Sequence, residues 1–512
     1  MLQPLRDKGG RGDVVQSRGI TAPWRGLNLR DRLEEQSTEY AIQMDNFIPE
    51  NGEATLRNGY SEHVTGLPAT IETLMEYATG SATKLFAASS AGIYDVTTAG
   101  AVGSAAVSSL SNARWSHTQF GTTSGQYLVC TNGADGVRNY NGSTWATPTI
   151  TGATSADLNY VTSHKGRLWF IEKDSLSLWY LATNAISGAA TEFPLEGLVR
   201  NGGTLVAASS WSIDSGDGQD DLFVIVTSEG EVLVYAGTDP ASDYSLKGIF
   251  KTARPLGNRC MVRYGGELVI LTRSGPVACS ELLRAVAIQD QQFAALVRSG
   301  FIEEAVANGS EFGWQAHLYT SRGWLMFNVP TDFGSETYRQ YLLNEGSWFR
   351  FREIPAVCWG ELSGTLYFGA ADGTVYKADD PDAEGDNGTE IQGRLQWAWS
   401  RFGTPAKKAF KMARPHMEAD AKPSPYMQMM TDYFTSPPDN QPTITSNTAG
   451  SAWDEGIWDV SSWAGSKNSY SQLIGLNGIG HVGSLHMRIR TKTLELFKVN
   501  GVEVMYETGG FR

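Results

Sequence analysis

Short apolar strands separated by glycine-containing turns recur along the first three quarters of the chain. Each unit consists of an apolar and aromatic strand, a small polar turn and a second strand, as in Leu222–Tyr235 and Thr365–Lys377. The leading leucines of the units are Leu85, Leu128, Leu168, Leu222, Leu268, Leu325 and Leu366. Their mean spacing of about 47 residues lies within the range of propeller blades. The pattern therefore predicts an all-β protein with a β-propeller of six or seven blades.

A large β-sandwich, or two stacked sandwiches, is the alternative to a ring of blades. The regular spacing and the glycine turns favour the propeller. Each predicted blade exposes an apolar face that only a neighbouring blade would cover, so the blades should close into a ring. We expect the propeller to span residues 36–378.

One segment, at about residues 281–308, breaks the strand pattern. Apolar side chains recur there at helical spacing: Leu282, Val286, Phe293, Leu296 and Val297. Ser280 precedes them and suits a helix N-cap. The segment predicts a short helical insertion, which either packs on the flank of the propeller or contacts a neighbouring subunit.

The repeat stops near residue 378, and strands with strict alternation follow. Apolar and polar side chains alternate over 391–400 and again over 485–490. Asn500-Gly501, between two further apolar runs, is a strong hairpin signal. These patterns predict a second, β-sandwich-like domain over residues 379–512.

Composition adds an acidic balance to this picture. The chain has 41 Lys and Arg against 55 Asp and Glu, which gives a net charge of −14. Such a balance argues against a protein whose whole surface surrounds nucleic acid. The four cysteines form no CxxC pair, and we expect them to be buried free thiols.

The N-terminal segment is basic, unlike the chain as a whole. Residues 1–32 contain seven basic and three acidic side chains, a local charge of +4. This composition predicts a flexible basic arm over residues 1–35 that becomes ordered on a partner. The candidate contact residues of the arm are Arg6, Lys8, Arg11, Arg18 and Arg25.

Two further basic clusters lie in the predicted second domain. The first comprises Lys407, Lys408, Lys411 and Arg414, and the second comprises Arg488, Arg490 and Lys492. Each cluster either meets a phosphate backbone or an acidic partner, or is simply solvated.

The motifs in the chain predict no catalytic, cofactor-binding or metal-binding residue. The segment 478–483 matches GxGxxG, but a strand follows it, whereas a dinucleotide site needs a helix there. The acidic segment 379–390 does not continue into a calcium loop, and the seven histidines lack metal-ligand spacing. We also find no signal peptide and no membrane span, and therefore expect synthesis in a cytoplasm.

A series of short segments resembles the tail nozzle family of short-tailed bacteriophages, also called tail tubular protein B or packaged-DNA stabilization protein. The segments, in chain order, are 24–30 (WRGLNLR), 41–49 (AIQMDNFIP), 56–60 (LRNGY), 323–330 (GWLMFNVP), 343–348 (LNEGSW), 357–360 (VCWG), 366–376 (LYFGAADGTVY), 402–408 (FGTPAKK) and 506–510 (YETGG).

The resemblance implies a structural, non-enzymatic virion protein made in the host cytoplasm. It implies a ring, expected to be hexameric, below the portal and its adaptor ring, with tail fibres or spikes as further partners. The lumen would conduct and seal phage DNA without sequence-specific binding. The basic arm would then contact the adaptor. The alternative is a phage tail-associated propeller that binds or hydrolyses host surface glycans, for which paired carboxylates would be needed.

Overall fold

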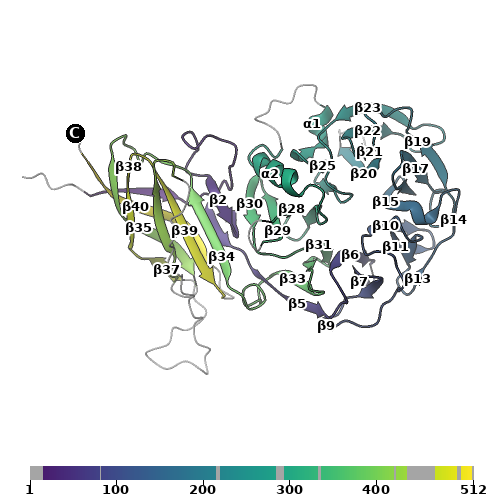
Figure 1. Cartoon of the computed structure of the whole chain (residues 1–512), viewed down its shortest axis with the longest axis horizontal. Helices are drawn as coiled ribbons and strands as arrows, with labels where there is room; N and C mark the ends of the chain where they lie inside the picture. The colour runs from purple at the N-terminus through teal and green to yellow at the C-terminus, as the bar shows by residue number, and fades with distance from the viewer. Residues whose placement is uncertain are drawn as a thin grey trace, which may run out of the picture. The chain divides into compact units, whose positions relative to one another are not determined.

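The computed structural model describes residues 15–80, 82–214, 219–283, 293–332, 336–419, 423–434, 468–492 and 497–509. The chain divides into two compact units. The propeller unit comprises Gly59–Glu345 and Phe351–Pro381, and the sandwich unit comprises Met1–Asn58, Gly346–Arg350 and Asp382–Arg512. Each unit is coloured along the chain in Figure 1.

Seven groups of strands form the described part of the propeller unit and are arranged as blades around a ring (Figure 1). Six of them are small separate sheets, and the strands of blade 6 belong to an eight-stranded sheet that continues through β30 (Ser347–Phe351). Their strands, in chain order, are β6 (Ile71–Ala78), β7 (Thr83–Ser89) and β8 (Gly92–Asp95) in blade 1; β10 (Ser116–Thr122), β11 (Gly125–Thr131), β12 (Arg138–Tyr140) and β13 (Trp145–Ala146) in blade 2; β15 (Leu158–His164), β16 (Arg167–Glu172), β17 (Ser177–Tyr180) and β19 (Thr191–Pro194) in blade 3; β20 (Leu205–Asp214), β21 (Gln219–Thr227), β22 (Glu231–Ala236) and β23 (Ser245–Lys251) in blade 4; β24 (Met261–Tyr264), β25 (Glu267–Thr272) and β26 (Gly275–Ala278) in blade 5; β27 (Gln315–Tyr319), β28 (Trp324–Pro330) and β29 (Tyr338–Asn344) in blade 6; and β31 (Cys358–Leu362), β32 (Thr365–Gly369), β33 (Val375–Asp380) and β5 (Gly59–Thr65) in blade 7. Short additions are β9 (Gly100–Ala101), β14 (Ile150–Thr151), β18 (Gly188–Ala189) and the 3-10 turn Ser155–Asp157.

The ring closes through its first strands and through its last blade. The first strand of each blade contacts the first strand of the next, from β6 around to β31 and back to β6. Blade 7 takes its outer strand, β5, from the N-terminal side of the propeller, and β5 runs antiparallel to β33. The prediction of an all-β propeller is confirmed, and the blade number is seven.

Each blade is buried on both faces, which explains the nearly continuous apolar runs in the sequence. On β7, Leu85 and Ala87 pack towards blade 7 in a cluster with Tyr367. The intervening residue Phe86 packs the other way, against Tyr140 of blade 2, with ring centroids 4.8 Å apart. Neighbouring blades therefore share one core, and removing a blade would expose two apolar surfaces.

The sandwich unit contains two facing groups of strands. One group comprises β1 (Gln16–Thr21), β3 (Phe47–Glu50), β4 (Glu53–Leu56), β35 (Lys408–Ala419), β37 (Asn468–Ser471), β38 (Ile474–Gly480) and β40 (Lys498–Thr508). The other comprises β2 (Ala41–Asp45), β30 (Ser347–Phe351), β34 (Ile391–Trp397), β36 (Tyr426–Thr431) and β39 (Gly483–Thr491). The groups approach closely at Gly393, where a Cβ atom would lie 2.7 Å from both Leu56 Cδ1 and Phe47 Cε2.

This division differs from the predicted domain boundaries of 36 and 378. Residues 36–58 and 346–350 belong to the sandwich unit, because β2 pairs with both β34 and β30 and β4 pairs with β40. The predicted arm over 1–35 also differs in its described part. Residues 16–21 form β1, which pairs along its whole length with β40. These boundaries depend on pairing between strands that lie hundreds of residues apart, which the local pattern of apolar and polar residues does not reveal.

The predicted insertion contains α1 (Cys279–Leu283) and α2 (Arg298–Asn308), while Val286 lies outside the described residues. On α2, Phe301 is buried, and its ring lies 4.5 Å from that of Tyr341 in blade 6. The helix therefore packs on the flank of the propeller. Its outer side carries Ile302 and Val306, which are 38% and 82% exposed. No helix among the described residues is long and apolar enough to cross a membrane.

A buried ion pair in the sandwich unit joins the segments between which the propeller is inserted. Arg57 donates from Nη1 and Nη2 to the two carboxylate oxygens of Asp386, at 2.7 and 2.6 Å. Arg57 Nε donates to Asn46 Oδ1 at 2.9 Å. The two charged side chains are only 2% and 5% exposed. The pair is therefore bidentate, shielded from water and rigidly held.

We expect Asp386→Asn to destabilise the sandwich unit by about 3 to 5 kcal/mol, because it leaves the Arg57 guanidinium buried without its charged partner. Hydrogen exchange of the β4 and β34 amides at increasing denaturant measures the loss. Glu384→Gln is the matched control, since Glu384 is an exposed acid in the same segment. Equal effects of the two variants would contradict the prediction.

Candidate anion-binding face

The structure gives the predicted arm residues different surroundings. Arg6, Lys8 and Arg11 lie outside the described residues. Arg18 is an exposed residue of β1. Arg25 forms an ion pair with Glu39 at 3.0 Å, and its guanidinium lies 5.2 Å from the centroid of the Trp24 ring. Arg25 is therefore engaged within the sandwich unit.

Three of the four cations in the first predicted basic cluster have oxygen partners within the unit. Lys408 is fully buried on β35, and its ammonium donates to the carbonyls of Thr404, Ala406 and His481 at 2.7 to 2.8 Å. On the same strand, Lys411 pairs with Glu507 at 3.1 Å and Arg414 pairs with Glu503 at 3.3 Å. We conclude that these cations mainly hold the sheet and its loops together.

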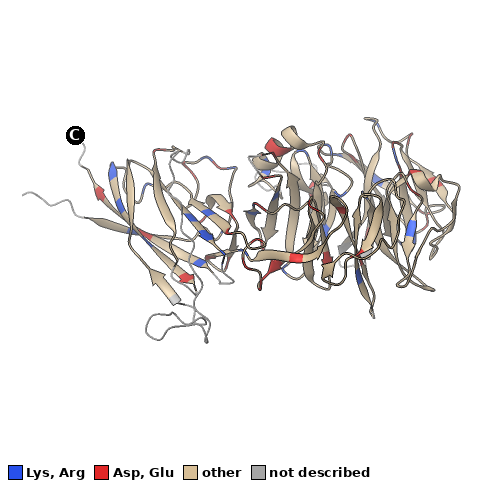
Figure 2. Ribbon diagram, turned by 60° about the horizontal axis from the view of Figure 1, so that its bottom comes forward, with Lys and Arg blue, Asp and Glu red and all other residues tan. Residues whose placement is uncertain are grey.

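The second predicted cluster belongs to a basic face formed by the other group of strands. Figure 2 shows several Lys and Arg residues on the strands of the sandwich unit. In the antiparallel register of β34 and β39, Arg394 lies opposite Arg488 and Gln392 lies opposite Arg490. Opposite side chains have Cβ atoms about 4.5 to 5.5 Å apart, so the arginines are direct neighbours. We name the set Arg350, Arg394, Arg488 and Arg490, with the polar residues between them, the basic face.

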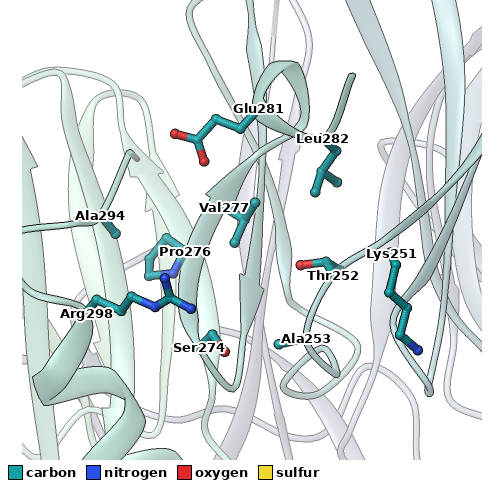
Figure 3. A pocket seen from close by; sticks show the side chains of 10 residues that line it. All are labelled: Lys251, Thr252, Ala253, Ser274, Pro276, Val277, Glu281, Leu282, Ala294 and Arg298. Carbon is teal, nitrogen blue, oxygen red and sulfur yellow. The ribbon is translucent and has the colours of Figure 1, made fainter. Parts of the chain in front are cut away.

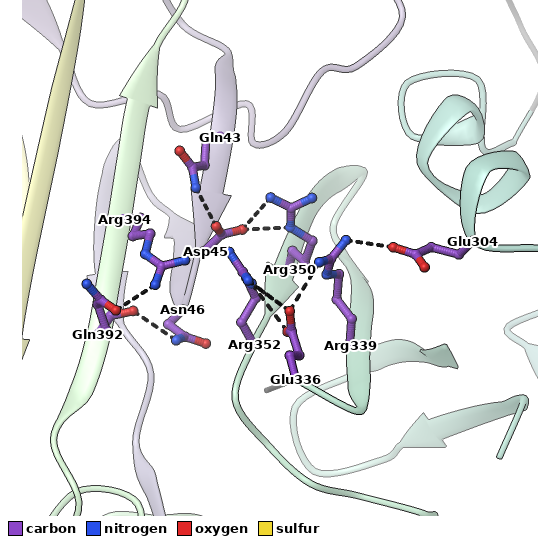
Figure 4. Close-up of polar contacts among 10 residues, drawn as sticks. All are labelled: Gln43, Asp45, Asn46, Glu304, Glu336, Arg339, Arg350, Arg352, Gln392 and Arg394. Atoms are coloured by element: carbon purple, nitrogen blue, oxygen red, sulfur yellow. Dashed lines mark hydrogen bonds and ion pairs between the residues drawn. The ribbon is translucent and has the colours of Figure 1, made fainter. Parts of the chain in front are cut away.

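One acid lies on the five strands of the basic face. Asp45 on β2 is fully buried, pairs with Arg350 at 2.6 Å and accepts a hydrogen bond from Gln43 Nε2 at 2.6 Å (Figure 4). These strands contain four arginines and a single carboxylate, which leaves a formal charge of 4 − 1 = +3. Neither Arg488 nor Arg490 has an acidic partner among the described residues.

The environment of the face disfavours positive charge. Burial, followed by the charges of Arg394 and Arg490, lowers the pKa of the Arg488 guanidinium. Burial, followed by the charges of Arg488 and Arg394, lowers the pKa of His486 to about 4, while Asp45 opposes this shift. His486 is therefore neutral at pH 7.

Several buried polar atoms on this face have no hydrogen-bond partner in the described part of the chain. They are Arg488 Nε, Gln392 Nε2 and both ring nitrogens of His486. The side chains of His486 and Gln392 lie in residues that are only 5% and 7% exposed. Unsatisfied buried donors are costly, and a group that accepts several hydrogen bonds would relieve them. Sequence alternation placed the arginines on one face, whereas the contributions of Gln392 and His486 emerge from the register.

A different arrangement occupies the axis of the propeller. Arg259, which precedes β24, donates from Nη2 to the Glu72 carbonyl at 2.8 Å and to Thr73 Oγ1 at 2.6 Å. Arg114, which precedes β10, pairs with the Glu72 carboxylate at 2.9 Å. Both guanidinium groups lie over the ring of Phe312, at 5.2 and 4.3 Å from its centroid. These contacts join blades 1, 2, 5 and 6, and we call them the axial strap.

The pockets of the propeller unit bear on the glycan alternative. A pocket of about 280 Å³ lies beside the insertion, and Glu281 is its acidic lining residue (Figure 3). A second pocket of about 390 Å³ contains two acids, Asp174 and Glu229. Glu229 is paired with Arg254 at 2.8 Å. The second pocket is therefore the place to test whether a pair of carboxylates, Asp174 and Glu229, hydrolyses glycans.

The other candidates from the sequence are accounted for as follows. All four cysteines are buried and free, as predicted. The GxGxxG segment continues into β39. Within the acidic segment 379–390, Asp380 pairs with Lys377 at 2.9 Å. No group of three or more His, Cys, Asp and Glu is placed to hold a metal within the described ranges.

Comparisons with known proteins concern the fold alone. Neither the protein-family models nor the curated proteins contain a match. The chain is similar to BBS1N solved in complex with ARL6DN, at 12% identity and a TM-score of 0.38, over 63% of this chain and 97% of that one. It is also similar to YCF48 from Cyanidioschyzon merolae, at 11% identity and a TM-score of 0.37, over 63% of this chain and 99% of that one. A third similar structure is the WD40 β-propeller domain of Doa1, at 11% identity and a TM-score of 0.36, over 62% of this chain and 96% of that one. These similarities support no inference about function.

We expect the sandwich unit to lose stability as the pH falls from 6.5 to 4, partly through His486. The unfolded chain binds the imidazole proton near its ordinary pKa of 6.5, whereas the folded unit binds it only near 4. The slope from this one group reaches about 1.4 kcal/mol per pH unit. Hydrogen exchange of β39 between pH 4 and 7 should show a shallower slope in His486→Gln. The exposed His416→Gln is the control, and identical slopes in all three proteins would refute the assignment.

Proposed function

We propose that the chain is a structural virion protein that forms the tail nozzle ring of a short-tailed bacteriophage, below the portal and its adaptor. The observation that carries this proposal is the ordered series of segments that resemble the nozzle family. These segments are distributed over both units. For example, 41–49 covers β2 and 402–408 leads into β35 in the sandwich unit, while 323–330 covers β28 in the propeller unit.

The axial strap supports a conduit between copies of the chain. Arg259 and Arg114 meet over Phe312, so side chains link blades on different sides of the ring. Duplex DNA would instead pass through a lumen enclosed by several copies. Six copies would carry 6 × −14 = −84 charges, and an acidic wall repels a polyanion and lets it slide.

Mass photometry and negative-stain imaging of the purified chain, alone and with portal–adaptor complexes, test this proposal. We expect closed rings of about six copies that join the complex and do not hydrolyse surface glycans. A chain that stays monomeric and never joins the complex would overturn the proposal. Glycan hydrolysis that disappears in the Asp174→Asn, Glu229→Gln double variant would favour the glycosidase alternative.

The outer side of α2 supplies a test of the subunit contact. We expect Val306→Lys to reduce the fraction of assembled ring severalfold and to leave the melting temperature of the monomer unchanged, because Val306 is 82% exposed and contributes little packing there. Leu246→Lys, at a partly exposed apolar residue of β23, is the control. Undiminished assembly of Val306→Lys would exclude this surface as the contact.

A further inference from the structure

We propose that the basic face of the sandwich unit binds a phosphate group through Arg488 and Arg490, with Gln392, which lies opposite Arg490, as a further hydrogen-bonding group. The proposal concerns a site outside the nozzle resemblance and does not depend on it. It rests on three properties of the face: its charge, its unsatisfied donors and its geometry.

The charge of Arg488 and Arg490 favours an anion beside them. Arg394 and Arg488 lie directly opposite each other on paired strands, and like charges in this arrangement are destabilising. Both arginines are only partly exposed, so water screens their repulsion incompletely. The single carboxylate, Asp45, is already paired with Arg350. An anion bound beside Arg488 and Arg490 would offset the remaining positive charge.

The donors of the face need an acceptor. Arg488 Nε and Gln392 Nε2 have no partner among the described residues. A phosphate group has several strongly accepting oxygens and can receive hydrogen bonds from both of these side chains. The first basic cluster provides the contrast within the same unit, because Lys408, Lys411 and Arg414 all have oxygen partners.

The geometry favours phosphate over a single carboxylate. Arg488 and Arg490 lie two residues apart on β39, so their side chains point to the same face of the sheet. Two guanidinium forks side by side match the several oxygens of a phosphate. A phosphate also carries more negative charge than a carboxylate, about −1.5 to −2 at pH 7 for a monoester, and so neutralises more of the positive charge of Arg488 and Arg490.

The test uses the full chain in phosphate-free buffer. Isothermal titration with inorganic phosphate should show binding to the wild type, and phosphate should raise its melting temperature. We expect the Arg488→Met, Arg490→Met double variant to bind phosphate at least tenfold more weakly. In the absence of phosphate, the melting temperature of the double variant should equal or exceed that of the wild type, because replacing closely spaced partly buried cations with apolar side chains relieves repulsion.

Matched controls separate this site from general basicity and separate the two sources of phosphate. Arg414→Met removes one arginine from the other sheet and should leave phosphate binding unchanged. A short DNA duplex, titrated in parallel, shows whether the site also accepts the phosphodiester backbone; duplex binding that requires Arg488 and Arg490 supports the site even where free phosphate binds weakly. The proposal is overturned if neither phosphate nor duplex binds, if the double variant binds as tightly as the wild type, or if acetate competes equally.

Discussion

The fold depends on bringing two distant parts of the chain together in one blade. Strand β5 lies at the beginning of the propeller sequence, yet it completes the sheet that β31, β32 and β33 form at the end. Without this pairing, blade 7 would expose the open edge of β33. The buried pair of Arg57 and Asp386 lies just outside the same two segments, since Arg57 is two residues before β5 and Asp386 is six residues after β33. In the sandwich unit, the Arg57–Asp386 pair therefore joins the chain just before the propeller to the chain just after it.

Closure of the ring also limits what the propeller can do. Its first strands surround the axis, and the axial strap places two guanidinium groups and an aromatic ring there. A propeller of this kind is a rigid building block. In the proposed nozzle, its role is to shape the wall of an assembly, while the acidic balance of the chain keeps that wall from adhering to DNA. The basic face of the sandwich unit is the local exception to this balance, which is why we propose it as a binding site.

Sequence reasoning reached the propeller because both faces of each blade are buried, so its inner strands appear as apolar runs between glycine turns. Each of the seven leading leucines lies on the second strand of a blade, from Leu85 on β7 to Leu366 on β32. The domain boundaries could not be predicted from the sequence, because β2 pairs with strands some 300 and 350 positions later in the chain. The same limit hid the Arg57–Asp386 pair. The basic residues can be read from the sequence, but only their partners in the folded chain distinguish buried Lys408, held by loop carbonyls, from Arg488, which has no acidic partner among the described residues.

The central claim is that DNA passes between copies of the chain and not along the axis of a propeller. A cryo-EM map of the assembled tail with DNA inside tests it most directly. The account predicts duplex density on the symmetry axis of a ring of copies, with Arg114, Arg259 and Phe312 still in contact within every propeller. Duplex density along the axis of a single propeller, with the axial strap displaced, would contradict it.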